Sequence, residues 1–142
     1  MNKFFFLSLF ALTSLLACRP EIRVPGGELS QLYQDWTLVG IMDDGDWRVP
    51  PADFDPITMR LESRGQAGLQ TSCNIGGGDF TANAVGDFQF NASTFTEMYC
   101  GELRHEWETL YVESLSEVEQ FGLADDRLRL WSDEVSLEFR LE

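Results

Sequence analysis

Two segments in the C-terminal part of the chain alternate apolar and polar residues strictly, and this pattern constrains the fold more than any other feature. Residues 127–131 and 135–141 each place every second side chain on one face of an extended strand. Polar residues at 132–134 separate the two segments, and a pair of aspartates at 125–126 precedes the first, which predicts antiparallel hairpins. The chain must therefore bury one face of an antiparallel sheet.

One segment has the helical period that would let it cover such a sheet. Over residues 102–115, one side of a helical wheel collects Leu103, Trp107, Leu110, Tyr111, Ser114 and Leu115. Further strands are expected at 36–42, 57–61, 68–73, 79–84, 87–90 and 117–123, with a helical lead-in at 28–34 and a loop at 47–56. The pattern predicts an α+β fold, mainly antiparallel sheet with one packed helix.

The N-terminus has the composition of an export signal. Lys3 supplies a small positive region, residues 4–17 are almost wholly apolar, and Ala17 precedes Cys18. This run is too short for a comfortable membrane span, which needs about 20 apolar residues. The Leu-x-Ala-Cys ending resembles the lipobox of bacterial lipoproteins, which implies cleavage before Cys18 and acylation of that residue. An ordinary secretory leader, cut near Ala17, is the alternative.

These features divide the chain into a lipoprotein signal peptide at 1–17, a lipidated tether at 18–27 and a folded domain at 28–142. The tether holds two prolines and two glycines and little apolar content, as flexible linkers do. Acyl chains such as palmitate would hold the protein at a membrane, because each buried methylene contributes about 0.8 kcal/mol. The predicted location is the cell envelope; in a Gram-negative host, Arg19 favours the outer membrane, facing the periplasm.

The charge of the chain excludes one class of partner. The sequence has 24 acidic residues against 10 basic ones, a formal net charge of −14. The only lysine is Lys3, so a protein that loses its leader is more acidic still. Phosphate backbones repel such a polyanion, and nucleic-acid binding is not expected. Acidic lipid headgroups repel it as well, so attachment to a membrane must come from the acyl chains.

Two cysteines remain once Cys18 carries lipid. Cys73 and Cys100 would then lie in an exported, oxidising compartment, where a disulfide between them is the expected state. A metal pair or a redox dithiol is the alternative, although the chain contains neither a Cys-x-x-Cys motif nor a cysteine–histidine cluster.

Several short motifs follow one another along the chain. The first is Cys-Asn, three residues, Gly, one residue and an aromatic, formed by Cys73, Asn74, Gly78 and Phe80. The second is Thr-x-Met-x-Cys, formed by Thr96, Met98 and Cys100, and the third is Glu-x-x-aromatic-x-x-x-Leu, formed by Glu108, Tyr111 and Leu115. A Trp-x-Leu motif near the start of the domain consists of Trp36 and Leu38, and a Leu-x-Leu motif near its end consists of Leu128 and Leu130. This ordered set resembles the META domain family, which includes the HslJ-like bacterial lipoproteins, over residues 33–141. One departure is Ser72, which replaces the glycine usually found before Cys-Asn.

The resemblance implies a fold, a disulfide and a lack of catalysis. It implies an antiparallel sheet curled into a partial barrel around one helix, a META domain at 28–142, and pairing of Cys73 with Cys100. The family has no established catalytic activity, so no enzyme activity, cofactor or metal is expected. Some members resemble lipid-binding pilotins of secretion systems, which suggests a hydrophobic groove. Here Trp107 and Tyr111 would line such a cleft, and a filled core is the alternative.

Other candidate sites have simpler interpretations. His105 is the only histidine; it lies on the side of the helix opposite the apolar residues, without the serine partner of a catalytic triad. The aspartates at 43, 44, 46, 53 and 55 lack the spacing of a calcium-binding loop and indicate polar turns. The three glycines at 76–78 lack the Lys-Ser/Thr of a phosphate-binding loop and are expected to let the backbone turn beside the cysteines.

The sequence therefore favours an envelope-anchored lipoprotein whose META domain is a non-catalytic binding or stress-related module. Its expected partners are the membrane, through the N-terminal lipid, and an unidentified envelope protein or apolar ligand. A carrier of a lipid or another apolar ligand, resembling the pilotins, is the second hypothesis. An enzyme that uses His105 is the third.

Overall fold

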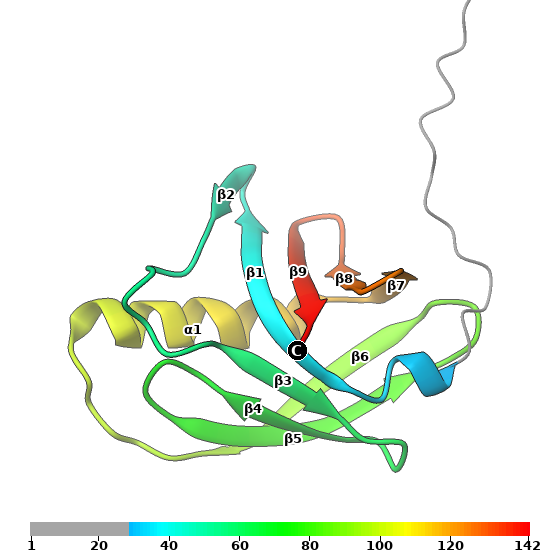
Figure 1. Cartoon of the computed structure of the whole chain (residues 1–142), viewed down its shortest axis with the longest axis horizontal. Coiled ribbons are helices and arrows are strands. Elements are labelled where there is room, and N and C mark those ends of the chain that lie inside the picture. Colours follow the sequence, from blue (N-terminus) through cyan, green and yellow to red (C-terminus); the bar gives the residue numbers. More distant parts are fainter. Residues whose placement is uncertain (1–28) are drawn as a thin grey trace, which may run out of the picture.

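A computed structural model describes residues 29–142 of the chain (Figure 1). The predicted leader, Cys18 and the predicted tether lie outside the described residues. In order, the elements are η1 (Leu29–Gln31), β1 (Asp35–Asp43), β2 (Asp46–Arg48), β3 (Thr58–Leu61), β4 (Gln66–Gln70), β5 (Ile75–Ala82), β6 (Phe88–Phe95), α1 (Glu102–Glu117), β7 (Gln120–Ala124), β8 (Arg127–Trp131) and β9 (Val135–Leu141). Within residues 29–142, no helix is both long enough and apolar enough to cross a membrane.

The strands of this described region form one curled sheet. Their order is β6-β5-β4-β3-β1-β9-β8-β7, β2 pairs with β1, and every pairing is antiparallel. The two edges of the sheet meet where β6 begins beside β7. The Phe88 N–H donates to the Glu119 carbonyl and the Phe121 N–H donates to the Gly86 carbonyl, each at 2.8 Å. The predicted α+β fold, a partial barrel with a packed helix, is confirmed.

Helix α1 packs against the curled sheet and fills its interior. It passes behind β1 and β9 in Figure 1, and its buried side chains are Trp107, Tyr111, Ser114 and Leu115. The Tyr111 hydroxyl donates to the Thr58 carbonyl at 3.4 Å, and burial raises the pKa of Tyr111 above its ordinary value. The helix thus supplies the apolar surface that the concave face of the sheet needs.

A cluster of aromatic rings joins the strands near the point where the sheet meets itself. Phe80, Phe88 and Phe90 are buried. The Phe80 and Phe88 rings stack with centroids 5.6 Å apart, and Phe121 meets Phe88 edge-on at 6.3 Å. Such pairs add about 0.5–1.5 kcal/mol each beyond the burial of their area. The cluster stabilises the contact between β5, β6 and β7.

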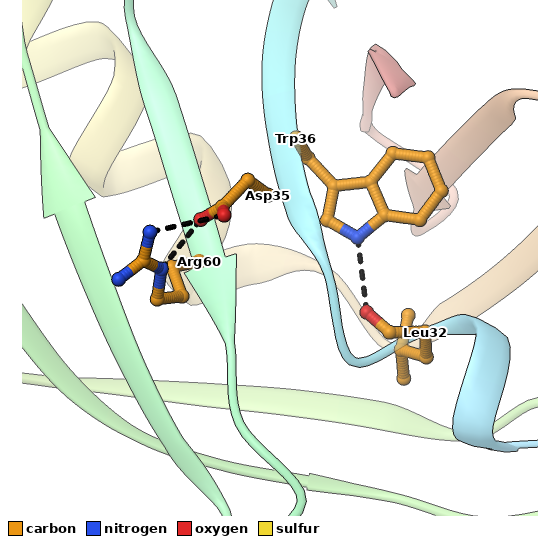
Figure 2. Close-up of polar contacts among 4 residues, drawn as sticks. All are labelled: Leu32, Asp35, Trp36 and Arg60. Atoms are coloured by element: carbon orange, nitrogen blue, oxygen red, sulfur yellow. Dashed lines mark hydrogen bonds and ion pairs between the residues drawn. The ribbon is translucent and has the colours of Figure 1, made fainter. Parts of the chain in front are cut away.

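The start of β1 shows how alternate residues of a strand face the core and the solvent (Figure 2). Trp36 is buried, and its indole Nε1 donates to the Leu32 carbonyl at 2.9 Å. The neighbouring Asp35 accepts two hydrogen bonds from Arg60 of β3, at 2.5 and 3.0 Å. The hydrogen bond that Arg60 donates to Asp35 raises the pKa of the exposed Arg60 guanidinium above its ordinary value. The two contacts hold β1 to the chain before it and to its neighbour β3.

Several predicted boundaries are wrong in informative ways. The strand expected at 117–123 begins only at Gln120, because α1 continues to Glu117. The segment expected at 87–90 extends to Phe95, and the 47–56 loop begins with the last residues of β2, which pairs with the end of β1. Leu103 was expected on the packed side of the helix but is 51% exposed, because the first turn of α1 precedes the part that packs on the sheet.

The prediction that Gly76, Gly77 and Gly78 form a turn is also wrong, because all three lie within β5. Their lack of a side chain is required by close packing of strands. A Cβ atom at Gly77 would lie 2.4 Å from the Ala67 carbonyl oxygen, and one at Gly78 would lie 2.0 Å from the Asn91 carbonyl oxygen. The pairing of β5 with β6 also shifts register between Gly77 and Gly78. The glycines therefore permit a close backbone approach rather than a turn.

We predict that Gly78→Ala lowers the free energy of unfolding by about 2 to 3 kcal/mol, because the new methyl group meets backbone that has no room to move. Gly68→Ala in β4 is the matched control, since the nearest atom to its Cβ is 4.0 Å away and its side of the strand is exposed. Denaturant unfolding measures both. Equal stabilities of the two variants would contradict the explanation.

Candidate functional site

The side chain of Asn74 lies at the centre of the motif residues and is buried. Its Oδ1 accepts hydrogen bonds from the Thr96 hydroxyl and from the Met98 N–H, both at 2.8 Å. Its Nδ2 donates to the Met98 carbonyl and to Glu108 Oε1, both at 3.1 Å. A second pair of bonds, Thr96 N–H to the Ile75 carbonyl and Ile75 N–H to the Thr96 hydroxyl, runs beside it. One amide thus connects the start of β5, the loop after β6 and helix α1.

The loop before Asn74 is organised by a second polar side chain, Thr71. The Thr71 hydroxyl oxygen accepts the N–H groups of Asn74 at 2.7 Å and of Cys73 at 3.2 Å. The same hydroxyl donates to Glu108 Oε2, with the two oxygen atoms 2.6 Å apart. Glu108 of α1 therefore accepts from both Thr71 and Asn74, one at each carboxylate oxygen. This carboxylate holds the helix to the Cys-Asn loop.

The disulfide and an arginine complete the connection. Cys73 and Cys100 are bonded, with Cα atoms 5.8 Å apart, which confirms the predicted disulfide. Arg104, one turn into α1, donates to the Ser72 carbonyl at 2.9 Å, and its guanidinium lies over the Phe54 ring at 4.4 Å. We call residues 96–101 the motif loop: the disulfide holds one end, and Asn74 holds the other.

Apolar side chains are exposed along this loop and beside it. Met98 is 60% exposed and Tyr99 is 79% exposed, within the loop itself. Ile75 at the start of β5 is 62% exposed, and Leu103 follows the loop in the first turn of α1. The backbone of the loop is thus fixed by the buried Asn74 amide and by the disulfide, while its apolar side chains face solvent.

The structure brings together some of the predicted site residues and separates others. Cys73, Cys100, Asn74, Thr96 and Met98 form the network described above. Gly78 lies farther along β5, where it contacts β6, and Phe80 is part of the core. Trp107 and Tyr111 are 3% and 0% exposed and pack in the same core, so they line no open cleft, and the filled-core alternative describes this region.

Two surface depressions in residues 29–142 lie elsewhere. One, between β6 and the C-terminal end of α1, is lined mainly by polar residues that include Gln89, Glu117, Glu119 and Asp133. The second, beside the β5–β6 hairpin, is lined by residues such as Asn83 and Asp87. Neither offers the apolar lining that a lipid chain needs.

Two further predictions concern polar groups. His105 is exposed on α1, as expected. The aspartates at 43–46 form the turn between β1 and β2, where Asp44 and Gly45 adopt positive φ angles of 47° and 85°. In the described part of the chain, no cluster of three or more His, Cys, Asp or Glu side chains is placed to hold a metal ion.

Two members of the network were not predicted from the sequence. Thr71 and Arg104 lie outside the motifs, and nothing in their local pattern distinguishes them. Glu108 belongs to one of the motifs that carry the family resemblance, but its contacts could not be predicted from the motif. Its position one turn before the buried Tyr111 places it at the edge of the packed face, where it reaches the Cys-Asn loop.

The fold and the network define a class of protein: an α+β domain with a curled antiparallel sheet, whose loop before the helix is held by a buried asparagine and a disulfide. The model of the META domain family matches residues 29–142, and the chain belongs to this family. The sequence has no significant match among curated proteins.

Solved structures share the fold. A protein from Burkholderia xenovorans, determined by NMR, is 23% identical with a TM-score of 0.64; the match covers 83% of this chain and 90% of that one. A DUF4847 family protein from Bacteroides vulgatus ATCC 8482, determined by crystallography, is 10% identical with a TM-score of 0.59 and covers 79% of this chain and 96% of its own. At these identities the similarity establishes the fold alone.

We predict that Cys73→Ser and Cys100→Ser each lower the free energy of unfolding by about 3 to 4 kcal/mol, because the bond spans a sequence separation of 27 residues and restricts the unfolded chain. The double variant should be no less stable than either single one. Chemical denaturation of the three variants measures this, and clearly additive losses would contradict a shared bond.

A second prediction concerns the amide of Asn74. Asn74→Asp removes the donors to Met98 and Glu108 and places a second carboxylate beside the first, so we expect a loss of about 2 to 4 kcal/mol. Adding Glu108→Gln supplies a new donor and should recover part of this loss. Glu113→Gln, on an exposed position of the same helix, is the matched control and should recover nothing. Equal recovery of stability by Glu108→Gln and Glu113→Gln would contradict a direct contact between Asn74 and Glu108.

Proposed function

We propose that this protein is an envelope-anchored lipoprotein whose META domain is a non-catalytic binding module, and that the motif loop is its binding element. The observation that carries the proposal is the contrast within the loop. The buried Asn74 amide and the Cys73–Cys100 disulfide fix its backbone, and yet Met98 and Tyr99 remain largely exposed. Loops held rigidly by a scaffold are common positions for binding residues, because little entropy is lost when a partner docks.

The hydrogen bonding of the motif supports a binding role rather than a chemical one. The amide of Asn74 has two donors and two acceptor positions, and all four are used within the domain. The carboxylate oxygens of Glu108 accept from Thr71 and Asn74. Groups that are bonded in this way hold the structure together and are not free to exchange protons with a substrate.

The attachment to the envelope is supported by the sequence that precedes the domain. The apolar run ending at Ala17 and Cys18 has the pattern of a lipoprotein signal, and the proline- and glycine-rich segment 18–27 would connect the lipid to the domain. The outer membrane, facing the periplasm, is the proposed location in a Gram-negative host. A stress-related role of the module stays a prediction.

The experiment uses the full chain, expressed with its leader in a bacterial host, with a photo-crosslinking amino acid at Tyr99. Intact mass should show a chain that begins at acylated Cys18, and Cys18→Ser should abolish acylation. Crosslinks to envelope components should form from position 99 and not from Val85, which is 84% exposed in the β5–β6 turn and serves as the matched control. Equal crosslinking from both positions, or a product without fatty acid, would contradict the proposal.

A further inference from the structure

We infer that the motif loop, with Ile75 and Leu103 beside it, is a docking surface for a basic amphipathic segment of another protein. This inference rests on the proposed function and adds the chemistry of the partner. Four apolar side chains are exposed around one disulfide, and Tyr and Met are residue types enriched in protein interfaces. The cluster is small, so the expected interface is weak and transient.

The charge around the cluster specifies the partner. Glu97 within the loop and Glu102 at the start of α1 are both exposed, and within residues 29–142 neither carboxylate is paired with a basic group. The nearby guanidinium of Arg104 is partly buried and donates to the carbonyls of Ser72 and Asp53. The surface therefore combines apolar groups with unpaired negative charge, and lysine or arginine side chains complement it.

Tyr99 strengthens this preference. Its ring is 79% exposed, and a guanidinium or ammonium group over an exposed aromatic face gains about 0.5–1 kcal/mol. The domain already contains contacts of this type, since Arg48 lies over the Trp107 ring and Arg129 lies over the Trp131 ring. A partner that carries basic residues between apolar ones can pair with the two carboxylates and also place a cation over the Tyr99 ring.

Two other occupants fit the surface less well. Anionic lipid headgroups would be repelled by Glu97 and Glu102. The motif loop also lies at the end of the domain opposite η1, where the described chain begins (Figure 1). A second copy of the chain would bring the same carboxylates together, in a protein with a net charge of −14.

The backbone of the loop is prepared for binding before the partner arrives. The disulfide fixes Cys100, Asn74 fixes Met98 through both its N–H and its carbonyl, and Gly101 closes the loop with a φ of 98° that other residues rarely adopt. A preformed loop loses little conformational entropy when it docks, which compensates for its small area.

The test uses the full lipidated protein in nanodiscs of zwitterionic lipid and three fluorescent peptides of one length. One peptide has Leu and Lys in an amphipathic pattern, one replaces Lys with Glu, and one replaces Leu with Ser. Fluorescence anisotropy should show that the Leu/Lys peptide binds at least about tenfold more tightly than either of the others. Equal binding of the Leu/Glu or the Ser/Lys peptide would overturn the inference.

Variants locate the binding site. Met98→Ser with Tyr99→Ser should weaken binding at least about tenfold without changing the melting temperature, because both side chains are exposed, and Val85→Ser should change neither. Unaltered binding by the Met98 and Tyr99 double variant would overturn the inference.

A second set of variants tests the charge. Glu97→Gln with Glu102→Gln should weaken binding and reduce its dependence on salt. Asp125→Asn with Asp126→Asn, in the exposed β7–β8 turn, removes the same charge elsewhere and should have little effect. Equal effects of the two pairs would show attraction to net charge alone and would contradict a specific surface.

Two outcomes would assign the surface to a different occupant and would contradict the inference of a basic amphipathic partner. Binding to anionic vesicles that is lost with the Met98 and Tyr99 variant would assign the surface to lipid. Self-association lost with that variant would assign it to a second copy. If position 99 crosslinks to an envelope protein but the peptides show no preference for basic residues, the proposed function stands and this inference fails.

Discussion

The side-chain amide of Asn74 joins three parts of the domain that are distant in sequence, and the exposed loop depends on this connection. A buried amide is costly unless its donors and acceptors are paired, and here all four positions are paired, with two other segments: the motif loop supplies Thr96 and Met98, and α1 supplies Glu108. The network is therefore complete only when the loop, the helix and the start of β5 are all in place. The Cys73–Cys100 bond adds a covalent link between the same segments.

The sequence predicted the parts of the fold that depend on periodic patterns. Strict alternation located β8 and β9, and the helical period located α1, because each pattern reflects the burial of one face. The glycines at 76–78 were misread, since local sequence cannot tell a turn from a strand that another backbone approaches closely. That approach is set by Ala67 and Asn91, which are distant in sequence.

The candidate site was predicted in part for a similar reason. The resemblance to a family identified Asn74, Thr96, Met98 and the two cysteines, although their contacts could not be derived from spacing. Thr71 and Arg104 take part through hydrogen bonds whose partners the fold brings together, and they leave no local signature. Trp107 and Tyr111 were correctly identified as helix residues that face the sheet. Whether they line a cleft or fill a core depends on how far the sheet curls, and here the two ends of the sheet meet.

The binding role depends on a rigid motif loop, and hydrogen exchange at the Met98 amide tests this rigidity directly. This N–H belongs to a residue that is 60% exposed, so an unrestrained loop would exchange it at nearly the rate of an unfolded chain. Because the N–H donates to the buried Asn74 Oδ1, we expect protection comparable to that of the amides in β5. Exchange of Met98 at the rate of an unstructured peptide, in a domain whose strands are protected, would contradict the account.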